Sequence, residues 1–452
     1  MTELERALVE FLPRQRWFAG KGRTVVETRV EASVSLRTPL PSLSLMVVEV
    51  AFADGGQDRY AVPVGHDRGP EARQLATSDP EAVILETRGA RAGIFYDMVA
   101  DERLGAVFLD LIDKAETVQE LRFHKLPEWS DSLRGPGRPL AAEQSNTSLV
   151  FSDRLILKLF RRLQPGVNPE LEVTRALVGA GFKACAPPLG WVEGLGSTLA
   201  ILQPYFAGSV EGWKLATDRA TDHLRAGAAA DNFTGEAREL GVLTAEMHAA
   251  LAAALPVVAA AEPDLGAHFR LLGQLSQLAV TVPELAPYRH GIESVHAEAQ
   301  AAGEPRYLQR IHGDYHLGQV LRSDQDWVVI DWEGEPARSL EERRRLASPL
   351  RDVAGMLRSF DYAASYPLLL GEHAGAEPPA GDGTAWVEAN RAAFLDAYVG
   401  RAADGGWLPA SYDLELRTYE LDKAVYEVMY EARHRPGWVG IPLGGIRRLL
   451  GS

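Results

Sequence analysis

HGDYHLGQ, residues 312–319, and VVIDWE, residues 328–333, are the two short stretches that decide the fold of this chain. Asp314 and Gln319 lie five positions apart, and Asp331 lies 17 positions beyond Asp314. The apolar run before Asp331 predicts a short strand that holds its carboxylate at the strand end. The pattern therefore predicts two carboxylates and one amide, presented by a loop and by the strand that follows it.

These three side chains match the needs of phosphoryl transfer from ATP. That reaction requires a carboxylate near the acceptor hydroxyl, a second carboxylate on a metal ion that bridges the phosphates, and an amide or carboxylate that completes the metal coordination. In protein kinases the catalytic Asp and the metal-binding Asn have the same separation as Asp314 and Gln319, and the metal-binding Asp follows on the next strand. The order, spacing and local structure indicate a kinase-type site.

A lysine on a strand, paired with a glutamate on the next helix, should form the other half of such a site. Lys158 stands inside the apolar run LILKLF, residues 155–160, and Glu172 lies in the predicted helix over 168–181. Burying a lysine without a partner is costly, so we predict a Lys158–Glu172 ion pair. The alternative places Lys158 on the solvent face of a half-exposed strand.

No G-x-G-x-x-G loop precedes this lysine. EQSNTS, residues 143–148, stands in its place, and its backbone N–H groups and hydroxyls could hold phosphate oxygens. An ordinary polar hairpin is the alternative. The predicted phosphate-binding residues are Ser145, Asn146, Thr147 and Ser148. LQPYF, residues 202–206, is the candidate connector for adenine, with Gln203 and Tyr205 as the predicted contacts.

Composition shifts predict three regions. Residues 1–90 should form a β-rich cap opened by one helix, with a hairpin turn at Asp54-Gly55-Gly56. Residues 91–205 should complete an N-terminal lobe, in which GAVFLDLI, TSLVF and LILKLF form a meander that leads into a helix. Residues 206–452 carry Ala/Leu/Glu/Arg periodicity, which predicts a mainly helical lobe.

Composition also excludes several classes of protein. The 47 basic and 62 acidic residues among 452 give a net charge of −15, which disfavours nucleic acid as a partner. A single cysteine, Cys185, excludes an internal disulfide. No apolar run reaches about 18 residues, and charges interrupt MTELERALVEF at the N-terminus, so we expect a cytoplasmic chain without a membrane span.

Four segments together resemble the actinobacterial maltokinases over nearly the whole chain. They are HGDxHxxQ with IDWEGEP, SPLRDVAGMLRSFDYAA, LPRQRWFAGKGR and YELDKAVYEVMYEARHRP. The maltokinases belong to the aminoglycoside-phosphotransferase branch of the protein-kinase-like fold. The resemblance implies an α+β, bilobal protein-kinase-like fold with a β-rich N-terminal cap subdomain and a mainly helical C-terminal lobe.

The resemblance also implies roles for single residues. Asp314 would be the catalytic base, and His312 and Asp352 would brace its loop by hydrogen bonds. Gln319 and Asp331 would bind magnesium, and Glu333 would hold a second metal ion. Lys158, oriented by Glu172, would bind the α- and β-phosphates of ATP, and Ser145 with its neighbours would form the phosphate loop. Gln319 departs from the asparagine that is usual in the wider branch.

The sugar acceptor is expected at the C-terminal helix. Polar residues at spacings of three or four, flanked by Tyr426, share one face of this helix: Glu420, Lys423, Glu427, Tyr430 and Arg433. A solvated helix face is the alternative. Charges mixed with aromatic rings are typical of carbohydrate sites, and the resemblance places the sugar here. The predicted substrate contacts are Asp314, Glu420, Lys423, Tyr426 and Tyr430.

The resemblance implies an ATP- and magnesium-dependent kinase that converts maltose and ATP to maltose 1-phosphate and ADP, feeding α-glucan or glycogen synthesis. Trehalose synthase is the expected partner. The alternative acceptor is glucosamine, or another amino sugar or aminoglycoside, phosphorylated by the same machinery. A non-catalytic binding module is disfavoured, because it predicts loss of the base, the lysine or a metal ligand, and all of them are present.

Overall fold

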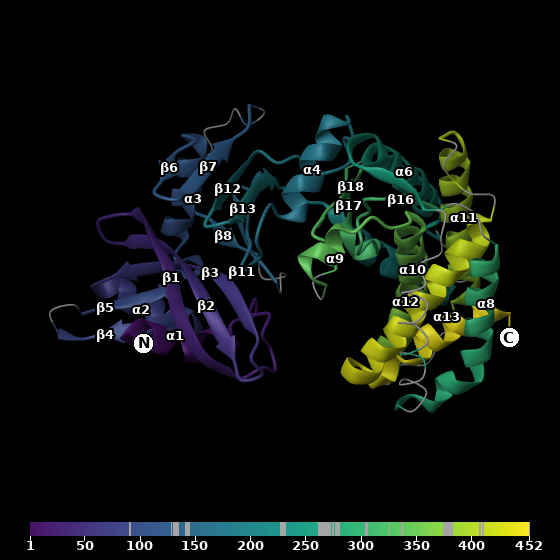
Figure 1. The fold of residues 1–452 in the computed structure, drawn as a ribbon, viewed down its shortest axis with the longest axis horizontal. Coiled ribbons are helices and arrows are strands. Elements are labelled where there is room, and N and C mark those ends of the chain that lie inside the picture. Colours follow the sequence, from purple (N-terminus) through teal and green to yellow (C-terminus); the bar gives the residue numbers. More distant parts are fainter. Residues whose placement is uncertain are drawn as a thin grey trace. The chain divides into compact units, whose positions relative to one another are not determined.

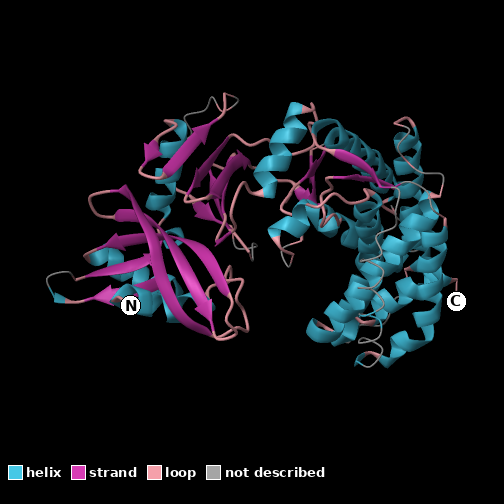
Figure 2. Ribbon diagram, in the orientation of Figure 1, coloured by secondary structure: helices cyan, strands magenta, loops and turns pink. Residues whose placement is uncertain are grey.

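The computed structural model of this chain divides into two compact units. Unit 1 comprises Met1–Arg175 and Ala186–Ala207, and unit 2 comprises Ala176–Cys185 and Gly208–Ser452. Strands predominate in unit 1 and helices in unit 2 (Figure 2). The structure describes all residues except 90–91, 128, 130–134, 141–144, 227–231, 261–272, 274, 276–280, 303–305, 325, 336–337, 374–382, 406–407, 409–410 and 452.

Unit 1 opens with a helix and an antiparallel sheet (Figure 1). The Thr2 side chain caps the first helix by accepting the Glu5 N–H, and the Glu5 carboxylate accepts the Thr2 N–H, which satisfies backbone donors at the helix start. The strand order is β1-β2-β3-β5-β4, with β11 paired to β3. The elements are α1 (Glu3–Phe11), β1 (Val25–Arg37), β2 (Ser42–Phe52), β3 (Gln57–Asp67), α2 (Pro70–Ser78), β4 (Val83–Thr87), β5 (Gly93–Asp97), α3 (Glu102–Asp113) and β11 (Arg162–Leu163).

The predicted hairpin at Asp54-Gly55-Gly56 is confirmed. Strands β2 and β3 pair from Ala51 opposite Gln57 to Ser42 opposite His66. The Asp54 carboxylate accepts a hydrogen bond from the Gly56 N–H at 2.9 Å. Gly55 adopts φ = 84°, in the left-handed region where a glycine has no steric penalty.

The second sheet of unit 1 contains the lysine strand. Its order is β6-β7-β12-β13-β10-β9-β8. Ser152 and Asp153, both with φ = 52°, connect β9 to β10, as expected for a tight hairpin turn. The elements are β6 (Thr117–Val118), β7 (Leu121–Lys125), β8 (Arg138–Pro139), β9 (Thr147–Phe151), β10 (Leu155–Leu159), β12 (Gly190–Gly194) and β13 (Ser197–Pro204). Helix α4 (Pro169–Gly179) begins in unit 1 and ends in unit 2.

The prediction that GAVFLDLI belongs to a strand meander was wrong. These residues lie in α3 and bury Leu104, Phe108 and Ile112 at helical spacing. A short apolar run fits a strand or a buried helix equally well, so periodicity cannot separate the two. Asp101 caps this helix, because its carboxylate accepts from the Arg103 N–H at 3.0 Å.

A short strand after the lysine joins the two sheets of unit 1. In β11, Arg162 pairs with Tyr60 of β3, and the Arg161 carbonyl accepts from the Ala61 N–H at 2.8 Å. The Arg161 side chain is 1% exposed. Its guanidinium lies 4.4 Å from the centre of the Trp17 ring and 2.8 Å from the Asp97 carboxylate. Trp17 of the RWFAGKGR segment therefore packs inside unit 1.

Unit 2 is mainly helical, as predicted. Helix α12 packs against α8, α10 and α13, and α6 packs against α11. A small sheet of order β14-β17-β18 interrupts the helices. The elements are β14 (Val210–Glu211), α5 (Gly212–Ala226), α6 (Thr234–Ala254), β15 (Val257–Ala260), α8 (Arg289–Ala301), β16 (Arg306–Gln309), β17 (Val320–Ser323), β18 (Asp326–Val329), α9 (Leu340–Arg344), α10 (Leu350–His373), α11 (Thr384–Ala403), α12 (Tyr412–His434) and α13 (Gly440–Leu450).

None of the helices in the described part of the chain is both long enough and apolar enough to cross a membrane.

Candidate active site

The loop that carries Asp314 is held by a buried carboxylate. Asp352, in the first turn of α10 and 1% exposed, accepts the His312 N–H at 2.8 Å and the Gly313 N–H at 2.9 Å. His248 Nε2 lies 3.3 Å from the same carboxylate. Burial tends to raise the pKa of Asp352, but the hydrogen bond and charge of His248, the His312 charge and the Gly313 N–H outweigh it, so the pKa is lowered.

His312 connects this loop to the strand end that carries Asp331. Its Nε2 lies 2.9 Å from the carbonyl oxygen of Ile330, and its ring centre lies 4.9 Å from that of Trp332. His312 is 2% exposed. The predicted bracing of the loop by His312 and Asp352 is confirmed.

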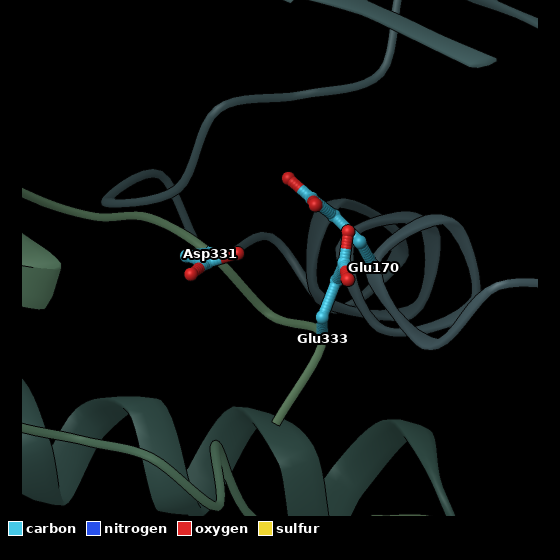
Figure 3. A group of neighbouring side chains, drawn as sticks. All are labelled: Glu170, Asp331 and Glu333. Carbon is cyan, nitrogen blue, oxygen red and sulfur yellow. The ribbon is translucent and has the colours of Figure 1, made fainter. Parts of the chain in front are cut away.

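Asp331 and Gln319 lie together in unit 2. Asp331 lies two residues beyond the end of β18 and adopts φ = 62°, a backbone conformation that Asp tolerates better than most residues. The Gln319 amide nitrogen lies 3.4 Å from the Asp331 carboxylate. One oxygen of Glu333 lies within 4.8 Å of an oxygen of Asp331. Figure 3 shows Asp331 and Glu333 leaving the same stretch of chain, and Glu170 leaving helix α4.

The donor set fits magnesium. Carboxylate and amide oxygens are the ligands that this hard cation prefers. A carboxylate oxygen of Asp331 lies within 4.8 Å of one of Glu333, which is close enough for both to bind one ion. The Gln319 nitrogen faces Asp331 here, so the amide would have to turn to offer its oxygen. These three residues are the ones that would hold the ion.

Lys423 lies beside Asp314. Its Nζ is 3.9 Å from an Asp314 carboxylate oxygen and 5.7 Å from the centre of the Tyr426 ring. Both charged side chains keep partial exposure, 36% for Lys423 and 24% for Asp314, so a ligand could reach them. Tyr430, one turn further along α12, is 41% exposed. Asp314, Lys423 and Tyr426 thus meet on one side of α12.

The interpretation of Glu420 as a sugar contact needs correction. Glu420 is 3% exposed and forms an ion pair with Arg391 of α11 at 2.7 Å. Glu427, a further carboxylate of the predicted stripe, is 8% exposed and pairs with Arg358 at 2.8 Å. Glu420 and Glu427 pair with arginines of neighbouring helices, so these two carboxylates stabilise the interior of unit 2.

Lys158 is buried and ion-paired, but with Glu170 and not with the predicted Glu172. The Lys158 ammonium lies 2.7 Å from the Glu170 carboxylate, and the two side chains are 10% and 4% exposed. Asn168 caps α4 by accepting the Glu170 N–H at 2.8 Å, which places Glu170 in the first helical turn. Two residues along a helix rotate a side chain by about 200°, so Glu172 leaves α4 in a different direction.

The predicted phosphate loop is only partly available to a ligand. Glu143 and Gln144 lie outside the described residues. Ser145 is exposed, and Asn146 is 8% exposed. The Thr147 hydroxyl accepts from Arg161 Nε at 2.7 Å, and Ser148 is completely buried in β9. Ser148 pairs with Lys158 of β10, so the two side chains lie on the same face of the sheet, and Ser148 stays a predicted phosphate contact.

The predicted adenine connector follows the end of β13. Gln203 is 5% exposed, and its side-chain amide donates to the Ala186 carbonyl at 3.0 Å, so this side chain is used within unit 1. Tyr205 donates its backbone N–H to the Arg154 carbonyl at 2.8 Å. Tyr205 remains partly exposed and stays a predicted nucleotide contact.

The comparison with protein families agrees with this geometry. Residues 136–398, more than half of the chain, match the model described as the phosphotransferase enzyme family. The chain belongs to this family. Residues 11–101 match the maltokinase N-terminal cap domain. This phosphotransferase therefore combines a maltokinase-type cap with a catalytic region of the wider family.

Two similar proteins are named glucosamine kinases. The phosphotransferase is 31% identical over 399 residues to the one from Mycolicibacterium smegmatis, which covers 85% of this chain and 97% of that protein. It is 31% identical over 319 residues to the one from Streptacidiphilus jiangxiensis, which covers 68% of this chain and 71% of that protein.

The fold resembles that of a solved glucosamine kinase in complex with glucosamine, ADP and inorganic phosphate. The TM-score is 0.72 at 23% identity, and the match covers 98% of this chain and 99% of that one. A second crystal form gives a TM-score of 0.72 at 24% identity, over 94% of both chains. The α+β, protein-kinase-like fold predicted from the sequence is thus confirmed.

Sequence reasoning missed two acidic residues. Glu170 was passed over for Glu172, although the Asn168 cap fixes which residues form the first turn of α4. Glu335, in the IDWEGEP segment, was not singled out. Its side chain is 16% exposed and lies 2.6 Å from Arg338. No spacing rule connects Glu335 with α12, so only the structure shows that Tyr426 contacts it.

Proposed function

We propose that this phosphotransferase is an ATP-dependent glucosamine kinase. The observation that carries the chemistry is Asp314 on a loop fixed by Asp352, with the Lys423 ammonium 3.9 Å away. Two relatives named glucosamine kinases, each 31% identical, support the acceptor. They favour the alternative acceptor predicted from the sequence over maltose.

In the proposed reaction Asp314 orients a sugar hydroxyl. The hydroxyl oxygen forms a bond to the γ-phosphorus of ATP, the bond from that phosphorus to the β,γ-bridging oxygen breaks, and ADP leaves. The hydroxyl proton passes to the Asp314 carboxylate. Positioning accounts for much of the rate enhancement, because phosphoryl transfer offers the protein little covalent chemistry.

Two sets of groups would bind the phosphates of ATP and neutralise their negative charge. Lys158, held by Glu170 at 2.7 Å, is the proposed ligand of the α- and β-phosphates. Asp331, Gln319 and Glu333 are the proposed magnesium ligands. A bound magnesium ion would supply positive charge to the phosphates at the point where negative charge develops.

Maltose is the second candidate acceptor. The match of residues 11–101 to the maltokinase N-terminal cap domain supports it. In that case the product would be maltose 1-phosphate, destined for α-glucan synthesis, and trehalose synthase would be the expected partner.

The test measures ADP release with ATP and magnesium against glucosamine, maltose, glucose and an aminoglycoside, with NMR of the product. Glucosamine-dependent turnover supports the proposal, and the NMR spectrum identifies the phosphorylated oxygen. Turnover with maltose alone would replace glucosamine by maltose and leave the catalytic assignments in place. Turnover with none of the four sugars would refute the sugar-kinase proposal.

A further inference from the structure

Glu335 belongs to the loop that follows the candidate metal ligands and lies against α12. The Tyr426 side chain forms a hydrogen bond with the Glu335 carboxylate, and the positive charge of Lys423 stabilises the ionised form of that carboxylate. Arg338 Nε donates to Glu335 Oε2 at 2.6 Å. Glu335 therefore contacts Tyr426, which the sequence predicts as an acceptor contact, yet no step of the proposed reaction uses Glu335.

Glu335 is part of a continuous set of side chains that leads to the catalytic base. Tyr426 joins Glu335 to Lys423, whose Nζ lies 5.7 Å from the centre of the Tyr426 ring. Lys423 in turn lies 3.9 Å from Asp314. A sugar whose hydroxyl reaches Asp314 would extend along this set, because the four side chains follow one another within unit 2.

The nearby carboxylates of α12 are engaged elsewhere. Each has a cationic or histidine partner within 3.2 Å: Glu420 with Arg391, Asp422 with His296, Glu427 with Arg358 and Glu431 with Arg435. Asp331 and Glu333 are the proposed metal ligands, and Asp314 is the base. Glu335 also has a cationic partner, Arg338, but it is neither a proposed metal ligand nor the base.

The Glu335 carboxylate has capacity for a further donor. A carboxylate offers about four lone-pair sites, and Tyr426 and Arg338 account for two of them. Arg338 is 44% exposed, so its ion pair is screened by solvent and can rearrange easily. An ammonium group brings three donors and a positive charge, which suits a carboxylate better than a neutral hydroxyl does.

We propose that Glu335 is the specificity-determining residue that accepts a hydrogen bond from the ammonium group of an amino-sugar acceptor. This inference rests on the proposed function and names the residue that distinguishes an amino sugar from a neutral sugar. Glu335 acts in recognition only, and Asp314 remains the base.

The experiment compares kcat/KM for glucosamine and for glucose, which differ only at the position of the amine. The variant is Glu335→Gln, which keeps the size of the side chain and removes its charge. The matched control is Glu341→Gln, on the short helix α9, where the side chain is 84% exposed. Because both sugars are measured on the same variant, a partly unfolded preparation changes both rates and leaves their ratio unchanged.

We expect Glu335→Gln to reduce the preference for glucosamine over glucose by roughly tenfold or more, since a hydrogen bond between two charged groups is lost. The rate with glucose should fall less than the rate with glucosamine, Glu341→Gln should keep the wild-type ratio, and Glu335→Asp should restore part of it. A Glu335→Gln variant that keeps the full preference overturns this inference alone. A wild-type enzyme that phosphorylates maltose and not glucosamine overturns the proposed function, and this inference with it.

Discussion

Replacing Asp352 by asparagine should weaken unit 2 and slow catalysis together. The carboxylate accepts two backbone N–H groups, from His312 and Gly313, in a site where it is 1% exposed. Asparagine offers one acceptor oxygen, so one of these N–H groups would face the amide nitrogen. A lost hydrogen bond to a charged group and an unsatisfied buried donor together cost about 3 kcal/mol. The free energy of unfolding of unit 2 should fall by that amount.

The same substitution tests the role of the loop in catalysis. A shift of Asp314 by about 1 Å lowers kcat by roughly one-hundredfold. The assays are urea unfolding followed by circular dichroism, and ADP release at saturating ATP and sugar. Asp218→Asn, on the exposed face of α5 with its side chain 57% exposed, is the matched control and should change neither quantity.

The effect should depend on pH in a defined direction. The pKa of Asp352 is lowered in the folded protein, so the unfolded state takes up its proton first as the pH falls. Its contribution to stability is therefore complete above the ordinary pKa of about 3.9 and is lost as the pH falls through the lower folded value. Between pH 6 and pH 3 the wild-type protein should lose this contribution to its free energy of unfolding. The Asp352→Asn variant should not show that loss. Unchanged unfolding and an unchanged kcat in the variant would refute the bracing role.

Three further predictions concern single side chains. Asp314→Asn should abolish ADP release while the melting temperature stays within about 2 °C, since Asp314 is partly exposed and surface changes have small effects; retained turnover in the coupled assay would remove Asp314 from the role of base. Lys158→Ala should raise KM for ATP and destabilise unit 1 by about 3 kcal/mol, because Glu170 loses the cation that faces it; the double variant with Glu170→Ala should recover part of that stability in urea unfolding, and no recovery would contradict the pairing. Tyr430→Ala should raise KM for the sugar severalfold with less than about 0.5 kcal/mol lost in stability; a sugar titration that gives the wild-type KM would exclude Tyr430 from the acceptor site.

Local patterns were sufficient for much of the fold. The Asp54-Gly55-Gly56 hairpin depends on turn chemistry that acts within a few residues, and the structure confirms it. The bracing roles of His312 and Asp352 were implied by the resemblance to the maltokinases, and the structure shows the hydrogen bond between them. Asp352 lies 40 positions beyond His312, so no local pattern connects the two residues.

Other features depend on contacts that no local pattern contains. The helical face with Glu420 and Glu427 looks like a ligand-binding stripe, but arginines from α10 and α11 neutralise it in the interior. Glu335 gains its importance from Tyr426, about 90 positions later in the chain. In each case the partner is distant in sequence, so spacing and periodicity could not reveal it.

The strand β11 has a consequence for how proteins of this architecture can change. Arg161 and Arg162 lie just beyond the lysine strand and contact Trp17, Tyr60 and Asp97 of the N-terminal region. In this chain that region is not a detachable module, because its removal would strip a buried guanidinium of its carboxylate and leave β11 without its paired strand β3. Recombination between relatives should therefore tolerate crossover points after Leu163 better than points between the first sheet and the lysine strand.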